Sequence, residues 1–120
     1  MSHISIIKTK IKSFNMDILR NAVLQFGEIE IVNSTRVYDR YTVVEGDLVV
    51  KDKVTGRYFA FKRNGEIVVD TYGWSERFSK LRDAVMQRYV ATLISQKLQK
   101  TGYKVNLTIR EGVIVGEGWK

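Results

Sequence analysis

The sequence predicts an α+β protein, in which two helices pack on one face of an antiparallel sheet. Two observations carry this prediction. Residues 28–72 consist of short runs rich in Val, Ile, Phe and Tyr, separated by Gly, Asn and Asp, which is the pattern of consecutive strands and tight turns. Residues 13–27 and 75–102 flank this region and repeat their apolar positions at helical spacing between a capping residue and a glycine.

The chain opens with its clearest strand pattern, over residues 4–14. Successive side chains of a strand point to opposite faces. One face takes Ile7, Thr9 and Ile11, and the other takes Lys8, Lys10 and Lys12. An antiparallel sheet commonly leaves one face in water, so we expect the lysine face to be solvated.

The first helix follows this strand. Ser13 or Asn15 can cap it, and Gly27 ends it after about Phe26. Four or five strands are then expected, among the runs over residues 28–32, 35–44, 46–52, 57–63 and 66–72.

Asn64-Gly65 is the strongest hairpin signal, because a two-residue type I′ turn needs positive φ at both positions. Such a loop pairs Arg63 with Glu66, Phe61 with Val68 and Phe59 with Asp70.

The stretch around Phe59 and Phe61 partly matches the aromatic strand of RNA-recognition motifs. The first strand supplies no aromatic partner, so we do not predict that motif. We expect both rings to face the core, because the opposite face of the hairpin is poor in side-chain volume. In the alternative, the two rings are exposed beside Arg57 and Arg63 and form a stacking surface or a subunit interface.

The second helix is expected to begin at Ser75 and to end before Gly102. Its apolar stripe predicts heavy burial against the sheet, with Leu81, Val85, Tyr89 and Leu93 in the core. A closing hairpin over residues 103–119 completes the order β-α-β-β-β-β-α-β-β. This order resembles the half-repeat of the TATA-box-binding-protein fold, and an elaborated ferredoxin-like arrangement is the alternative.

Length and composition predict a single domain over residues 1–120, with 44% hydrophobic and 28% charged residues. The chain has no cysteine and one histidine, which excludes thiol chemistry and argues against histidine metal sites. No apolar run approaches the roughly 20 residues of a membrane span, and the opening residues alternate instead of forming a signal peptide. We therefore expect a cytoplasmic protein without a membrane partner or a cofactor.

The opening Met-Ser-His, followed by Ser5 and the pair Thr9-Lys10, resembles a known family. Further matches are Asp47, Phe61, Asp70, Gln87, Tyr89 and Gly102. The family is hypothetical chloroplast reading frame thirty-five (domain of unknown function twelve fifty-seven), found in cyanobacteria, algal plastids and other prokaryotes. The resemblance implies one compact domain and brings no established activity or catalytic residue.

Positive charge is concentrated in two parts of a chain whose formal net charge is +7. Residues 1–26 carry four basic and one acidic side chain, and residues 75–110 carry eight and two. The candidate phosphate-binding residues are Lys8, Lys10, Lys12, Arg57, Arg63, Lys104 and Arg110. Lys104 and Arg110 would join the lysine face if the strand that carries them neighboured the first strand. The predicted partner is nucleic acid or an acidic protein.

Three alternatives stay open at this stage. The positive charge can serve solubility alone. The protein can be a structural or adaptor subunit that works as a homodimer or in a larger assembly. Asp47 and Asp70, with Asp39 and Glu45 the carboxylates of interest, could form an acid/base pair or hold Mg²⁺ if their strands were neighbours. Strand-end carboxylates are more often turn formers, so we predict a protein without enzymatic activity.

Overall fold

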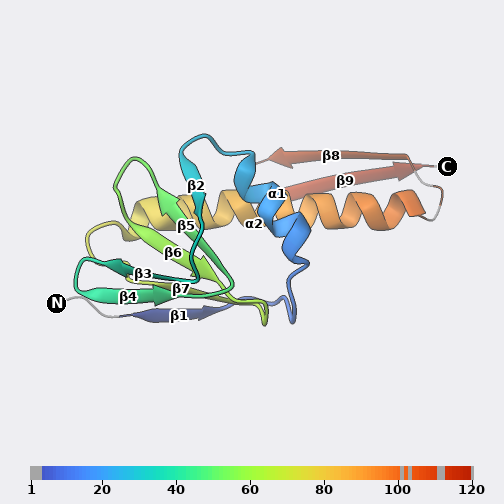
Figure 1. The fold of residues 1–120 in the computed structure, drawn as a ribbon. Coiled ribbons are helices and arrows are strands. Elements are labelled where there is room, and N and C mark those ends of the chain that lie inside the picture. Colours follow the sequence, from blue (N-terminus) through green and yellow to red (C-terminus); the bar gives the residue numbers. More distant parts are fainter. Residues whose placement is uncertain (1–3, 101, 103, 111–112, 120) are drawn as a thin grey trace. The chain divides into compact units, whose positions relative to one another are not determined.

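The computed structural model describes residues 4–100, 102, 104–110 and 113–119, with side chains for residues 4–100 and 102. The chain divides into two compact units, Met1–Phe78 and Ser79–Lys120, which we describe separately. The elements follow the predicted order closely, and the α+β class is confirmed (Figure 1).

A five-stranded antiparallel sheet in the order β1-β7-β6-β5-β2 forms the centre of the first unit. The elements of this unit are β1 (Ser5–Lys8), α1 (Met16–Leu24), β2 (Ile29–Val32), β3 (Arg36–Asp39), β4 (Thr42–Glu45), β5 (Leu48–Asp52), β6 (Tyr58–Phe61) and β7 (Glu66–Val69). β3 and β4 form a separate two-stranded ribbon. The helix α2 (Ser75–Lys100) begins in the first unit and continues into the second, where β8 (Lys104–Arg110) and β9 (Val113–Trp119) form a hairpin.

One face of the five-stranded sheet carries an aromatic core. Phe59 and Phe61 on the central strand β6 are fully buried. The ring centroid of Phe61 lies 5.7 Å from that of Phe14, which precedes α1. The ring centroid of Phe59 lies 5.4 Å from that of Phe78 in the first turn of α2. The expectation that both rings face the core is therefore confirmed.

The opposite face of the sheet is covered by the β3–β4 ribbon. Ala60 points to this side and clusters with Val49 of β5, Val68 of β7 and Val44 of β4. Val44 belongs to the ribbon and is completely buried. Small side chains on both layers let the ribbon approach the sheet closely. The sheet is thus packed on both sides.

The ribbon itself corrects a prediction. Residues 35–44 were expected to form one strand, but the chain reverses at Arg40 and Tyr41, so that Asp39 pairs with Thr42. Arg40 adopts a left-handed conformation with φ 59°, without the glycine or asparagine that normally indicates such a turn. The Thr42 hydroxyl donates to the Asp39 carbonyl over 3.0 Å and helps to close the reversal.

The β6–β7 hairpin has a different register from the predicted one. Phe61 pairs with Ile67 and Phe59 with Val69, one residue short of the expected partners. A shift of one residue moves every side chain of a strand to the other face. Ile67 and Val69 therefore extend the aromatic core.

The reason for this shift is the length of the turn. The Lys62 N–H donates to the Glu66 carbonyl over 2.8 Å, and the Gly65 N–H donates back to the Lys62 carbonyl over 3.1 Å. The loop is therefore residues 63–65, and within it positive φ is confined to Gly65, at 92°. This is the three-residue hairpin loop, in which a turn is followed by one left-handed residue. Arg63 lies in the loop and does not pair with Glu66.

The two helices begin where the sequence predicts. Asn15 caps α1, because its side-chain oxygen accepts the Ile18 N–H over 3.2 Å. α2 starts at Ser75 and is followed by Gly102, which has φ 85°. In the parts of the chain that the structure describes, neither helix combines the length and hydropathy needed to cross a membrane.

The apolar stripe of α2 is buried along part of its length. Leu81, Val85 and Tyr89 are buried, as expected. Leu93 and Ile94 are 38% and 39% exposed, so the prediction that the whole stripe is buried is wrong for its C-terminal part.

Candidate functional site

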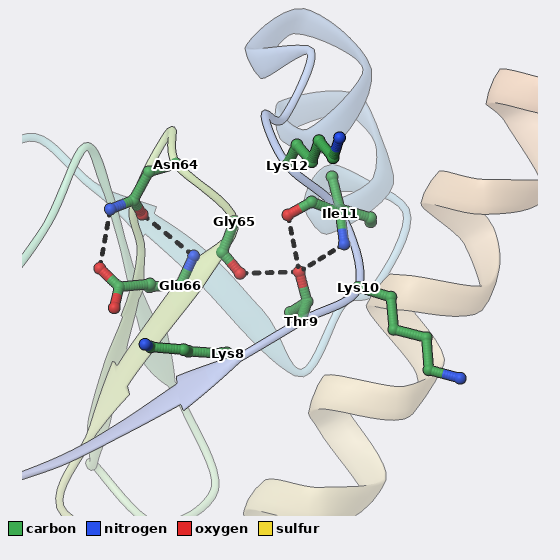
Figure 2. A pocket seen from close by; sticks show the side chains of 8 residues that line it. All are labelled: Lys8, Thr9, Lys10, Ile11, Lys12, Asn64, Gly65 and Glu66. Carbon is green, nitrogen blue, oxygen red and sulfur yellow. Dashed lines mark hydrogen bonds between the residues drawn. The ribbon is translucent and has the colours of Figure 1, made fainter.

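A hollow beside the β6–β7 turn contains the three lysines of the opening segment. It has a cavity volume of about 430 Å³. We call it the lysine hollow, and it is lined by Lys8, Thr9, Lys10, Ile11, Lys12, Asn64, Gly65 and Glu66 (Figure 2). The end of β1 and the segment after it thus form one wall, and the turn forms the other.

Thr9 joins these two walls. Its hydroxyl donates to the Gly65 carbonyl over 2.7 Å, and its backbone N–H reaches the same oxygen over 3.2 Å. The same hydroxyl accepts the Ile11 N–H over 3.1 Å, a local turn typical of Ser and Thr. β1 ends at Lys8, and these bonds hold the segment after it against the turn (Figure 2).

Gly65 permits this close approach. An added Cβ at this position would overlap the carbonyl oxygen of Ile11. The left-handed φ of 92° opposes a side chain independently. The shape of the hollow therefore depends on glycine at position 65.

The lysines retain the predicted alternation beyond the end of β1. Lys8, Lys10 and Lys12 are exposed, whereas Thr9 and Ile11 between them are half-buried. Figure 2 shows the three ammonium groups pointing in different directions around the hollow, with Lys8 extending along the side of Glu66. The backbone is fixed and the charged ends lie in water, an arrangement suited to a ligand with several separated negative charges.

Glu66 contributes the negative charge of the lining. It is the cross-strand partner of Lys8. Its carboxylate accepts a hydrogen bond from the Asn64 amide over 2.7 Å, and its own N–H donates to the Asn64 side-chain oxygen over 3.1 Å. Three lysines against one carboxylate leave the hollow electropositive.

Arg63, a further predicted binding residue, lies on the turn beside the hollow. Its side chain is exposed. Its backbone N–H donates to the Asp47 carboxylate over 2.7 Å, and its carbonyl accepts the Phe14 N–H over 2.8 Å. The turn that presents Arg63 is therefore held by the residue before β5 on one side and by the residue two before α1 on the other.

Arg57 is a correction, because the structure buries the residue that was predicted to bind phosphate. Its side chain is 4% exposed. Its Nε donates to both carboxylate oxygens of Asp39, over 2.8 and 3.1 Å, and its terminal nitrogens donate to the carbonyls of Asp70 and Tyr72. The guanidinium carbon lies 5.5 Å from the Trp74 ring centroid. Arg57 is a buried structural cation that ties the ribbon to the sheet.

This buried cluster was missed at the sequence level. Asp39 and Arg57 are 18 residues apart, and they meet because the chain reverses unexpectedly at Arg40. The signal that could have indicated the cluster is Asp39 itself, a carboxylate inside a run of β-formers.

The other predicted site residues are not brought together. Asp47 lies beside the β6–β7 turn, whereas Asp70 follows β7 at its far end and lies 3.8 Å from Arg57. β6 separates their two strands, so the condition for a paired-carboxylate site is not met. Phe59 and Phe61 are buried and do not form an exposed interface.

Lys104 and Arg110 were expected to join the lysine face only if their strand neighboured β1, and the two strands are not paired. Their strand, β8, pairs with β9 in a separate sheet, and β1 pairs with β7. The side chains of both residues lie outside the described ones.

A second ion-pair network connects β5 with the start of α2. Arg77 lies 3.0 Å from the Asp52 carboxylate and 3.1 Å from that of Glu28. Burial by itself would raise the pKa of Asp52, but hydrogen bonds from Arg77, Thr55 and the Val54 N–H, with the charge of Arg77, outweigh it and hold this pKa below its usual value. Asp52 is therefore a buried anion that stabilises the fold.

The fold and the hollow define an α+β protein with a small electropositive surface site. Comparison with family models, with curated proteins and with solved structures found no match.

Proposed function

We propose that the protein is a non-enzymatic module that binds the phosphate backbone of nucleic acid in the cytoplasm. Lys8, Lys10 and Lys12 of the lysine hollow would make the main contacts, and Arg63 on the adjoining turn would add another. Each contact neutralises a phosphate and releases a condensed counterion, which is the main source of affinity in sequence-independent binding.

The observation that carries the proposal is the placement of three exposed lysines on a segment whose backbone is fixed. The hydrogen bonds of Thr9 to Gly65 hold that segment without engaging the ammonium groups. A cation presented on a fixed backbone loses less conformational entropy on binding than one on a mobile tail.

The chemistry of the lining favours backbone contacts over base recognition. Among the eight residues that line the hollow, none is aromatic, so bases have no ring to stack on there. Lysine is a flexible point charge without the planar geometry that reads base edges. We therefore expect affinity for nucleic acid of any sequence.

The test is charge reversal of all three lysines to glutamate, called here the lysine-reversal variant. Binding to fluorescent oligothymidylate and oligoadenylate is measured by anisotropy across a salt series. The variant should bind both strands more weakly, and the slope of log K against log salt should fall in magnitude by about 2, since each lost contact on a single strand removes about 0.7.

A matched control separates the site from the overall charge. Arg20, Lys53 and Arg88 are exposed and lie outside the hollow. Reversing these three changes the net charge by the same amount, and this control variant should retain most of the affinity. Equal losses in both variants, or no loss in either, would exclude the hollow as the binding site.

The interface that the adaptor alternative predicted at Phe59 and Phe61 required both rings to be exposed, and both are buried.

A further inference from the structure

The outward face of the β3–β4 ribbon carries two exposed tyrosines and two exposed arginines. Tyr38 is 73% exposed and Tyr41 is 93% exposed. Arg36 and Arg40 are exposed as well. We call these four residues the tyrosine ribbon.

The strand register explains why they face outward. Val37 pairs with Val44, and both pack on the sheet side of the ribbon, where Val44 is completely buried. Alternation along β3 then places Arg36 and Tyr38 on the opposite side. Tyr41 lies in the turn itself, at the tip of the ribbon.

The ribbon is a rigid support for these side chains. Beneath it, the Asp39 carboxylate is 2% exposed and accepts hydrogen bonds from the Arg57 guanidinium and from the Tyr58 N–H. The Thr42 hydroxyl lies 3.2 Å from the Asp70 carboxylate. Aromatic rings on a fixed support bind at a lower entropic cost than rings on a mobile loop.

Arg40 adds an independent observation. Its left-handed φ of 59° is disfavoured for a residue with a side chain, and glycine or asparagine would fit better. Strain of this kind is concentrated at functional sites, where the side chain has a role outside the fold. Arg40 is exposed next to the most exposed tyrosine, where its guanidinium is available to a ligand.

We infer that the tyrosine ribbon is a base-stacking surface for single-stranded nucleic acid, an inference that rests on the function proposed above. Tyr38 and Tyr41 would stack on bases, and Arg36 and Arg40 would contact the adjoining phosphates. Exposed aromatics flanked by cations are the combination that single-strand binders use. Glu45 opposes Arg36 at the end of the ribbon away from Tyr41, so positive charge predominates at the tip.

A second copy of the chain fits this surface less well. A symmetric contact through this surface would gather the arginines of both copies in one interface, and the repulsion of like charges disfavours it. Single-stranded nucleic acid supplies both the negative charge that complements the two arginines and the flat bases that stack on the two tyrosines.

The test replaces Tyr38 and Tyr41 by alanine and measures binding to a single strand and to the same strand with abasic positions. The double variant should bind the normal strand about 5- to 150-fold more weakly for each stacked base lost. Its salt slope should equal that of the unsubstituted protein. On the abasic strand the two proteins should bind equally, because no bases are present to stack. Phenylalanine at both positions should restore binding.

Arg40→Gly supplies a variant in which a folding defect cannot explain the result. Glycine relieves the left-handed conformation, so the melting temperature should stay the same or rise, while affinity for the single strand falls. A loss of stability without a loss of affinity would overturn the role assigned to Arg40.

The failures of the two proposals are distinguishable. If the lysine-reversal variant binds weakly and the tyrosine variant binds normally, the hollow is a phosphate site and the ribbon is not a stacking surface. If the lysine-reversal variant binds normally, the hollow is not the phosphate site, and if the unsubstituted protein binds neither oligonucleotide, the proposed function itself fails. If the tyrosine variant binds normally and light scattering shows that it converts a dimer to a monomer, the ribbon is an interface between copies.

Discussion

At Gly65, a backbone conformation and a close contact both oppose any side chain. Gly65→Ala should therefore lower the free energy of unfolding by at least about 2 kcal/mol. This figure includes the cost of a left-handed conformation for alanine and the cost of displacing the segment at Ile11. The measurement is urea denaturation. Because the displaced segment carries Lys10 and Lys12, the variant should also bind nucleic acid more weakly.

Gly27 offers the matched control for this prediction. An added Cβ at Gly27 meets nothing within 4 Å, and its φ is outside the left-handed region. Gly27→Ala should change stability by less than about 1 kcal/mol. Equal effects of the two substitutions would show that the contact between Gly65 and Ile11 does not constrain the fold.

Single residues also show how far the sequence could predict the site. The exposure of Lys8, Lys10 and Lys12 could be predicted from the alternation of exposed and half-buried side chains. This alternation continues after Lys8, where the pairing of β1 with β7 ends. Burial of Arg57 could not be predicted in the same way, because its partner Asp39 is distant in the chain. Long-range pairing of charges leaves no local pattern.

Among the elements, β5 and the first turn of α2 are joined by a buried carboxylate. The lowered pKa of Asp52 means that the folded state keeps this group ionised at a pH where the unfolded chain, with a value of about 3.9, takes up a proton. Its contribution to stability is therefore complete well above pH ~4 and is lost as the pH falls through the folded-state value.

Asp52→Asn tests this link. At neutral pH the variant should be less stable than the unsubstituted protein by ~2 kcal/mol, the scale of a hydrogen-bonded charged group. The difference should shrink as the pH falls below about 4. Asp83→Asn, at a carboxylate that is 58% exposed, serves as the control and should show a much smaller difference at neutral pH. A difference for Asp52→Asn that stays constant down to acid pH would contradict the assigned role.

Elements with local signals could be predicted, and elements without them could not. Asn15 marked the start of α1 because capping chemistry is local. The reversal at Arg40 has no such signal and depends on packing beneath the ribbon. The hairpin register was one residue off because the asparagine of Asn64-Gly65 does not adopt positive φ.

In the first unit as a whole, β6 is the strand that is most completely shielded from solvent. It has a hydrogen-bonded neighbour on each side, the aromatic core on one face and the ribbon on the other. Amide exchange followed by NMR should be slowest in β6, slower than in the edge strands β1 and β2. Exchange in β1 as slow as in β6 would mean that the whole sheet opens in one step.

The bond between Thr9 and Gly65 has a consequence for how ligand binding could be observed. If the segment around Thr9 separates from the turn at Gly65, the lysine hollow no longer exists. An anion bound in the hollow therefore stabilises the arrangement in which Thr9 is hydrogen-bonded to Gly65. A ligand at a hundred times its dissociation constant would add about 2.7 kcal/mol to that stability. The amides of Thr9 and Ile11, both hydrogen-bonded in this arrangement, would then exchange more slowly in the presence of ligand. These two amides would thus report occupancy of the site without any label on the nucleic acid.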